Sequence, residues 1–404
     1  MKIVGRNNER VDSMIRRDQT LTDRQTRESN IELLKIIAII FIVLSHSMPD
    51  GDTARLSSAI NMGTENNPTY IVLQVMHNLG QIGNDIFLVC SFWFLLSSKK
   101  IKSKKIISLM MDALFVSLIS LSIFLLIGFR FPLEYFIRQF APNLFGNNWF
   151  LACYLSLYAI HPGLNLIIES LKDKTLFLTS FILGMMYCVI YFVLRNGGIY
   201  YNELIGFIVI YFLAAAVKRA NVYEKVSKKK MSLAIAISGL LMITVNYISV
   251  EITDSLYSRW NIIINPLFLI IAFSSFGIAI KTKIAVSKCI NYISSLSLLV
   301  YITHTNRIMR DYVRYAIFDW IKLNYTYHNL LLWCLLFFAF NLIYGMLFAV
   351  LYKESLQKAF ERIAGFIDQK LGLLYDMVWL HCCNYRMKLR GDYDEKRESQ
   401  DKKA

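Results

Sequence analysis

The chain has 404 residues, of which 55% are hydrophobic and 18% are charged, with a mean hydropathy of +0.43. Soluble globular proteins carry about 25% charged residues, so this chain has too little polar surface to cover two or three soluble domains. The net charge of +15 would suggest a nucleic-acid partner, unless the basic residues are sorted by membrane side.

Ten apolar segments are long enough to cross a bilayer as helices, which takes roughly 20 residues. They cover residues 31–48, 79–98, 106–128, 149–170, 175–194, 201–217, 232–249, 261–280, 290–309 and 329–352. Backbone polar groups cannot stay unpaired in lipid, so each segment is predicted to be helical. The predicted fold class is therefore all-α, a polytopic membrane protein with about ten transmembrane helices.

Basic residues set the predicted orientation. With the N-terminus inside, the cytoplasmic loops hold sixteen Lys and Arg residues and the external loops hold eight. Cytoplasmic loops are normally enriched in basic residues, so both termini are predicted to be cytoplasmic. Residues 1–30 form a polar cytoplasmic segment, 31–352 the ten-helix domain, and 353–404 a basic, amphipathic cytoplasmic tail. Topology thus explains most of the charge, and no nucleic-acid partner is expected.

The chain shows no cleavable signal peptide, because the first apolar segment follows about thirty polar residues and lacks a small-x-small cleavage site. The seven cysteines lie mostly within spans and show no CxxC spacing. We therefore expect neither disulfides nor a bound metal.

The first span holds three ionisable residues, Glu32, Lys35 and His46. Ionisable residues within a span are costly and usually functional. Lys35 and His46 are eleven residues apart, which puts them on one helix face and about 16 Å apart along the axis. Glu32 is close enough in sequence to pair with Lys35. The alternative is that Glu32 and Lys35 simply reach the cytoplasmic interface, and that His46 is an ordinary interfacial residue.

Other polar residues are predicted at the outer level of the bundle. Asp85 lies near the start of the second span, Trp149 opens the fourth, Glu203 starts the sixth, and His304 lies in the outer half of the ninth. A histidine oriented by a carboxylate is the usual arrangement for a general base acting on a hydroxyl, so His46 and Asp85 are candidate catalytic residues. The sequence leaves open whether these residues converge laterally, and Trp149 can equally be an interfacial anchor.

A dense cationic surface is predicted on the cytoplasmic side, from Arg27, Lys35 and the loop Lys99–Lys105. Such loops often do no more than satisfy the positive-inside rule. They also suit a polyanion such as the phosphates of coenzyme A.

Four segments carry recognisable motifs, namely Lys35 with His46, Gly83–Phe92, Asn147–Leu151 and Tyr301–His304. They resemble motifs of the membrane acyltransferase 3 family. The family opens with an Arg followed, after ten residues, by a His in the first span, and this chain keeps the spacing with Lys35 and His46. Gly83–Phe92 resembles the family's G-V-D-L-F-F-V-L-S-G run. Asn147–Leu151, with Tyr158 and Pro162, resembles W-F-L…Y…P. Tyr301–His304 resembles Y-L-I-H. Lys102 and Lys105 stand where the family carries an R-x-x-R pair.

The resemblance implies a multi-pass acyltransferase of the bacterial cytoplasmic membrane. Such a protein takes an acyl group, most often acetyl, from cytoplasmic acyl-CoA and places it on an extracytoplasmic acceptor, typically a hydroxyl of a cell-surface polysaccharide. The donor, acetyl-CoA, would be held through its phosphates by basic residues, namely Arg27, Lys35, Lys102 and Lys105. His46 would deprotonate the acceptor hydroxyl while Asp85 holds its orientation. Direct transfer and an acetyl-histidine intermediate both fit.

The acceptor would be bound by polar and aromatic residues of the outer level, namely Asn148, Trp149, Glu203 and His304. Two other functions remain open from the sequence. A polysaccharide exporter, flippase or other carrier would also have many spans and a polar interior. An acyltransferase of this kind can also act on a lipid, an amino sugar or a small metabolite.

Overall fold

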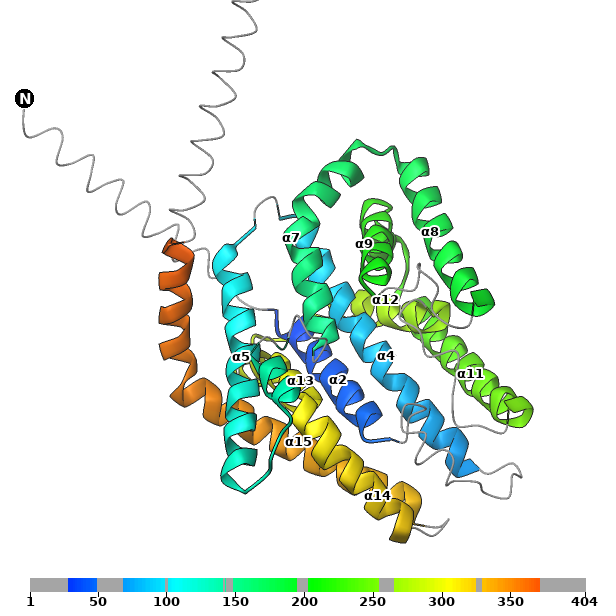
Figure 1. Cartoon of the computed structure of the whole chain (residues 1–404). Helices are drawn as coiled ribbons and strands as arrows, with labels where there is room; N and C mark the ends of the chain where they lie inside the picture. Colours follow the sequence, from blue (N-terminus) through cyan, green and yellow to red (C-terminus); the bar gives the residue numbers. More distant parts are fainter. Residues whose placement is uncertain are drawn as a thin grey trace, which may run out of the picture. The chain divides into compact units, whose positions relative to one another are not determined.

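The computed structural model describes residues 28–48, 68–98, 101–140, 142, 148–194, 203–253, 265–324 and 329–370. All regular elements in these residues are helices (Figure 1), which confirms the all-α fold class. A helix coincides with each of the ten predicted spans. These helices are α2 (Ser29–His46), α4 (Pro68–Leu95), α5 (Ser103–Leu126), α7 (Trp149–Ser170), α8 (Asp173–Leu194), α9 (Glu203–Arg219), α11 (Lys228–Thr253), α12 (Pro266–Lys281), α13 (Lys288–Thr305) and α15 (Leu330–Ser355).

Shorter helices, which the hydropathy pattern does not predict, lie between them. They are α6 (Leu133–Gln139), α10 (Val222–Lys225), the π-helix η1 (Met309–Arg314) and α14 (Tyr315–Asn324). After α15 the chain turns at Leu356 and continues as a helix over 357–370, the first part of the predicted tail. The remaining tail, 371–404, lies outside the described residues.

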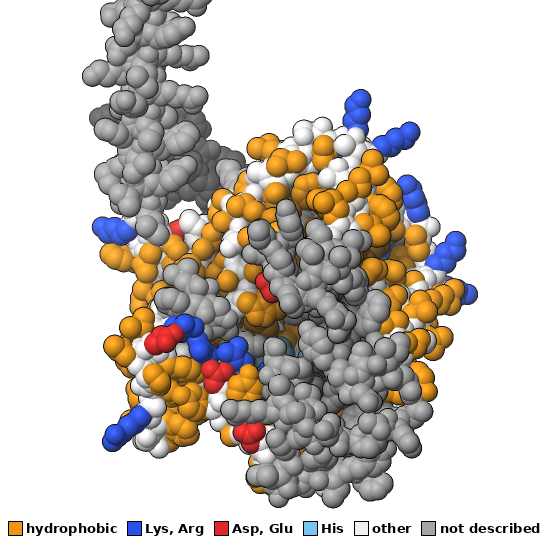
Figure 2. Space-filling view, turned by 45° about the vertical axis from the view of Figure 1, so that its right-hand side comes forward, with side chains coloured by type: hydrophobic (Ala, Val, Ile, Leu, Met, Phe, Trp, Pro, Cys, Tyr) orange, Lys and Arg blue, Asp and Glu red, His pale blue; other side chains and the backbone are white. Residues whose placement is uncertain are grey.

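Five of the described helices are long and apolar enough to cross a membrane, namely α2, α5, α7, the Lys228–Ile248 part of α11, and α15. The apolar helix α12 is shorter, with 16 residues. Hydrophobic side chains cover most of the described part of the face in Figure 2, and charged side chains gather in a few places. Lipid, unlike water, is a good solvent for such a surface, so the chain is a multi-pass membrane protein.

Local sequence signals set several helix ends. Asn265 precedes α12, and its side-chain oxygen accepts a hydrogen bond from the Leu267 amide at 2.9 Å, while Pro266 occupies the first helical position. Gly128 ends α5 in a left-handed conformation, with φ of 93°, which an L side chain rarely adopts.

The chain forms two compact units that alternate along the sequence. The first unit comprises Met1–Leu96, Ile168–Leu298 and Phe318–Leu342. Helix α4 is its central element and contacts α2, α9, α11 and α12 (Figure 1). The second unit comprises Ser97–Ile167, Leu299–Ile317 and Ile343–Ala404, and in it α5 contacts α6.

Helices α2 and α4 of the first unit approach closely at two glycines. A Cβ on Gly83 would lie 2.6 Å from the carbonyl oxygen of Ala38, and one on Gly80 would clash with the Ser45 side chain. Small residues let helix backbones approach in this way within membranes. Because the later glycine meets the earlier α2 residue, the two helices run antiparallel.

A buried apolar cluster joins elements of the second unit. Tyr135 of α6, Leu121 of α5 and Ile308, directly before η1, form this cluster, and Phe131 and Tyr312 pack against it. This contact places the short helix α6 beside η1.

Candidate functional site

His46 is the last residue of α2 and is held by both of its neighbours in the first unit. The Ser45 hydroxyl donates a hydrogen bond to the backbone oxygen of His77 on α4 at 2.6 Å. The Ser47 hydroxyl accepts one from the Asn341 side chain of α15 at 3.0 Å. Both neighbours of His46 are thus bonded to other helices. These bonds fix the position of the His46 backbone, from which its half-buried imidazole extends.

His77 is a functional candidate that the sequence analysis missed. Its Nδ1 atom lies 3.4 Å from the Ser45 hydroxyl, so a second histidine lies at the level of His46. The residue falls before the predicted start of the second span, which is why the sequence drew no attention to it.

Asp85 lies deeper in the helix than predicted. It is the seventeenth residue after Pro68 in a helix of 28 residues, and not near the helix start. Gly83 meets Ala38, so Asp85 lies close to the level of Ala38, about 12 Å along α2 from His46 at 1.5 Å per residue. The prediction of a single outer level for His46 and Asp85 is therefore wrong, because α4 begins eleven residues earlier than the apolar run.

The apolar run starts later than α4 because a stripe of polar residues lies on this helix, namely Gln74, Asn78, Gln81 and Asp85. Their spacing of four, three and four residues puts them on one helix face. Gln74, Asn78 and Asp85 are at most 3% exposed. Gln81 donates to Asp85 at 3.3 Å, and Asn78 donates to Asn246 of α11 at 3.0 Å. We call these five residues the α4–α11 polar stripe.

The α4–α11 polar stripe is incompletely paired. Gln74 Nε2, Asn78 Oδ1, Asp85 Oδ2 and Asn246 Nδ2 are buried and have no hydrogen-bond partner among the described residues. A buried polar group without a partner is costly, so such groups usually contact water or a ligand. Two of these atoms are donors and two are acceptors, which suits a ligand with hydroxyl groups or ordered water.

Lys35 forms the predicted pair with Glu32, with 2.9 Å between the ammonium nitrogen and the carboxylate, which confirms the expected partner. Glu32 also accepts a hydrogen bond from the Ser294 hydroxyl of α13. Cys90 of α4 lies close enough to interact electrostatically with both charged residues. The Lys35 side chain keeps 25% of its surface exposed, so the residue is not enclosed by the pair with Glu32.

In the second unit, Lys102 and Lys105 stand at the N-terminus of α5 and contact two tyrosines of α7. The Lys105 ammonium donates to the Tyr154 hydroxyl at 3.0 Å and lies 4.6 Å from the ring centre of Tyr158. The Lys102 amide donates to the Tyr158 hydroxyl at 3.2 Å. Both lysines are exposed, and the helix N-terminus adds a positive field of its own.

Asn148, Trp149 and His304 gather in the second unit. The Asn148 side-chain oxygen accepts a hydrogen bond from Thr305, next to His304, at 3.4 Å, while Asn148 Nδ2 is buried without a partner among the described residues. His304 Nδ1 lies 2.8 Å from the Val300 carbonyl, so Nδ1 carries the proton and Nε2 is an acceptor. Trp149 opens α7 with 36% of its surface exposed.

Of the two remaining predicted site residues, the structure describes only Glu203. Glu203 is the first residue of α9 in the first unit and is half-buried, as the sequence predicts for a helix start. Arg27 lies outside the described residues, as do Lys99 and Lys100 of the cationic loop. Within the described ranges, no group of three or more His, Cys, Asp or Glu residues could hold a metal ion.

A comparison with protein-family models shows the family of this chain. The acyltransferase domain of the acyltransferase 3 family matches residues 28–351, from the start of α2 to nearly the end of α15. The chain belongs to this family. Among curated proteins and solved structures, the comparisons find no match.

This membrane acyltransferase thus keeps the candidate residues of both units within the matched region, except Arg27, which precedes it by one residue. The family model also covers η1 and the other four residues of the α4–α11 polar stripe, whereas the motif comparison included only Asp85 of that stripe. The acyltransferase domain ends before the helix over 357–370.

Proposed function

We propose that this acyltransferase moves an acetyl group from cytoplasmic acetyl-CoA to a hydroxyl of an extracytoplasmic cell-surface polysaccharide. The observation that carries the proposal is the make-up of α2, where a partly exposed lysine and a fixed histidine lie on one face, about 16 Å apart. A donor bound by its phosphates at Lys35 would extend its pantetheine arm along this distance and bring the thioester to His46.

His46 acts as general base in this proposal. Its imidazole takes the proton of the acceptor hydroxyl while the hydroxyl oxygen attacks the thioester carbonyl carbon. The carbon–sulfur bond breaks, and the coenzyme A thiolate leaves and takes up a proton. The products are an O-acetyl ester and free coenzyme A.

Asp85 acts on His46 at a distance and is therefore a positioning residue. Gln81, one turn closer to the level of His46, donates its hydrogen bond to Asp85. By holding Gln81 in place, Asp85 also orders the part of the α4–α11 polar stripe that lies nearer to His46. His77 is a further residue with acid–base capacity, and it contacts Ser45 next to His46.

Lys102 and Lys105, with Arg27 and Lys35, bind the donor phosphates in this proposal. A lysine ammonium is a flexible point charge, so it benefits from partners that fix its position. Tyr154 and Tyr158 supply them for Lys105.

Replacing Lys105 tests this assignment of the donor side. A charge-assisted hydrogen bond is worth about 1.5–3 kcal/mol, so Lys105→Ala should raise KM for acetyl-CoA by at least about tenfold with little change in kcat. Tyr154→Phe keeps the ring and removes one hydrogen bond, so its effect should be smaller. Lys104→Ala is the matched control, since Lys104 is also exposed. Equal KM values for the Lys104 and Lys105 variants, measured in membranes with labelled acetyl-CoA, would show that Lys105 has no specific role.

Asn148, Trp149, His304 and Glu203 bind the acceptor in this proposal. Trp149 offers an exposed indole face for stacking on a sugar ring, and the unpaired Asn148 amide offers a donor for a sugar hydroxyl.

The topology that goes with these roles has ten spans, a ten-helix domain over 31–352, and cytoplasmic segments over 1–30 and 353–404, in a bacterial cytoplasmic membrane.

A deletion strain tests the proposed function. Surface polysaccharide from the parent, the deletion strain and the complemented strain is compared by NMR and mass spectrometry. Ester-linked acetate should disappear on deletion and return on complementation, while the amount of exported polysaccharide stays constant. A carrier would instead change the exported amount, and persistence of the acetate would exclude the proposed acceptor.

A further inference from the structure

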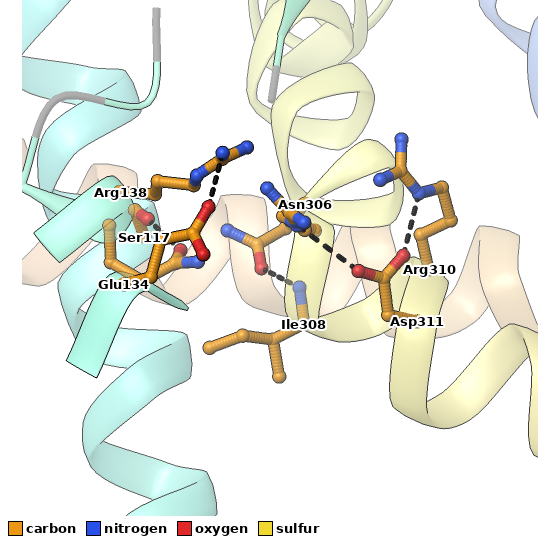
Figure 3. A network of polar contacts seen from close by, with 9 residues as sticks. Ser117, Glu134, Arg138, Asn306, Ile308, Arg310 and Asp311 are labelled. Atoms are coloured by element: carbon orange, nitrogen blue, oxygen red, sulfur yellow. Dashed lines mark hydrogen bonds and ion pairs between the residues drawn. The ribbon is translucent and has the colours of Figure 1, made fainter. Parts of the chain in front are cut away.

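Arginines gather where α6 meets η1 in the second unit. Arg138 lies on α6, Arg307 lies two residues before the start of η1, and Arg310 and Arg314 lie within η1. Figure 3 shows Arg138 and Arg310 on opposite sides of Asn306. We call this set, with Tyr135 and Gln139 of α6, the η1 arginine cluster.

The acidic groups of this region leave positive charge in excess. Asp311 accepts from Arg307 Nε at 3.1 Å and from Arg310 Nε at 2.8 Å, as Figure 3 shows for Arg310. Glu134 pairs with Arg138. Three of these arginines, Arg138, Arg307 and Arg310, thus share two carboxylates, and Asp311 accepts from two of them through their Nε atoms.

The outer ends of two guanidinium groups remain available. Among the described residues, no hydrogen bond is formed to the Nη atoms of Arg307 or Arg310. Arg307 lies with its guanidinium carbon 5.0 Å from the ring centre of Tyr135, a cation–π contact that helps to hold the group in place. A guanidinium fixed in this way presents its Nη atoms as a preorganised fork.

Two further donors lie in the cluster. The Tyr135 hydroxyl is buried and has no hydrogen-bond partner among the described residues, and the same is true of Gln139 Nε2, whose side chain is fully buried. Burial, followed by the negative charge of Asp311, raises the pKa of Tyr135 above its ordinary value. The hydroxyl therefore stays protonated and can donate.

The cluster offers hydrogen-bond donors and positive charge, which together suit an anionic oxygen ligand such as a carboxylate or a phosphodiester. It also lies next to proposed acceptor-binding residues, because Arg307 follows His304 by three residues and Thr305 bonds Asn148. We propose that the η1 arginine cluster binds an anionic group of the acceptor, so that the acceptor is an acidic polysaccharide. This inference rests on the proposed function and specifies its substrate class.

Binding by the purified full-length protein tests the inference without any transfer reaction. The protein is placed in nanodiscs of neutral phosphatidylcholine and titrated with oligogalacturonate, poly(glycerol phosphate) or neutral dextran. At least one acidic polymer should bind, dextran should not, and the two acidic probes distinguish a carboxylate from a phosphate ligand. Equal binding of dextran, or no binding of either acidic polymer, would overturn the inference. Binding of an acidic polymer only after phosphatidylglycerol is added to the nanodiscs would also overturn the inference.

Variants locate the site. Arg307→Gln and Arg310→Gln should each weaken binding of the acidic polymer at least about tenfold, the worth of one charge-assisted hydrogen bond. Arg310→Lys keeps the charge and should lose part of the affinity, which guards against a fold defect in the Gln variants. Arg130→Gln is the matched control, because Arg130 is an exposed arginine of the same unit before α6. Wild-type affinity in both Gln variants, or an equal loss in the control, would refute the site.

The two proposals fail in different ways. If the acidic polymer binds through the η1 arginine cluster but never receives acetate, the proposed function fails and the binding site stands. If acetate is transferred to a polysaccharide that carries no anionic group, the inference fails and the proposed function stands.

Discussion

A strain that carries His46→Ala in place of the wild-type gene is expected to make surface polysaccharide with little or no ester-linked acetate. Removing a general base typically costs 10²–10⁴-fold in rate, which should take acetylation below detection. The exported amount of polysaccharide should not change, because in this account the residue acts on the hydroxyl and not on transport. The measurement is the ester-acetate signal in NMR spectra of purified glycan, with the variant's abundance checked in isolated membranes.

Two histidine controls sharpen this result. His381→Ala removes a histidine beyond the matched acyltransferase domain and should leave acetylation at the wild-type level. His77→Ala removes the histidine that lies beside Ser45 and tests whether His46 acts alone. Normal acetylation in the His46 variant, with a loss in the His77 variant, would transfer the catalytic role to His77.

Asp85→Asn has the second largest expected effect. Asn has nearly the same shape, but its amide oxygen is a weaker acceptor for Gln81 than a carboxylate oxygen, and its NH2 group cannot accept at all. We expect kcat to fall by about 100-fold or more while KM for acetyl-CoA changes little, because Asp85 positions a catalytic group rather than the donor. Stability should hold or rise, since a fully buried group that can carry a charge is replaced by a neutral one. Kinetics and thermal unfolding of the purified variant check both parts.

Asp112 of α5 provides the matched control for Asp85. It is also a buried carboxyl group within a span, but it accepts a hydrogen bond from Tyr352 of α15 at 2.8 Å. Asp112→Asn should therefore keep nearly normal kcat. A normal kcat in Asp85→Asn, or an equal loss in both variants, would mean that Asp85 has no specific part in the reaction.

The helices could be predicted where hydropathy alone decides them. Ten apolar runs gave ten helices, because a backbone in lipid must satisfy its own hydrogen bonds. The start of α4 could not be predicted in this way, since Gln74, His77 and Asn78 lower the hydropathy of its first turns. Here His77 contacts Ser45 of α2 and Asn78 bonds Asn246 of α11, tertiary contacts that a local average of hydropathy does not contain. The helices α6 and η1 are too short to appear as spans.

In the candidate site too, contacts within one helix could be predicted from the sequence, and contacts between distant helices could not. The pair of Glu32 and Lys35 followed from a spacing of three residues on one helix, which local geometry fixes. The bond between Asn78 and Asn246 joins residues 168 positions apart, and no spacing rule connects them. Arg307 fell inside the predicted ninth span of 290–309, whereas α13 ends at Thr305 and leaves this arginine to the η1 arginine cluster.

Transfer across a sealed membrane tests the central claim most directly. The purified protein is reconstituted into tight vesicles with ¹³C-acetyl-CoA enclosed and the acceptor polysaccharide added outside. The account predicts labelled O-acetyl groups on the external polysaccharide of wild-type vesicles and none with His46→Ala, while acetyl-CoA stays enclosed. Labelling that requires donor and acceptor on the same side of the membrane, or that is unchanged in the His46 variant, would contradict it.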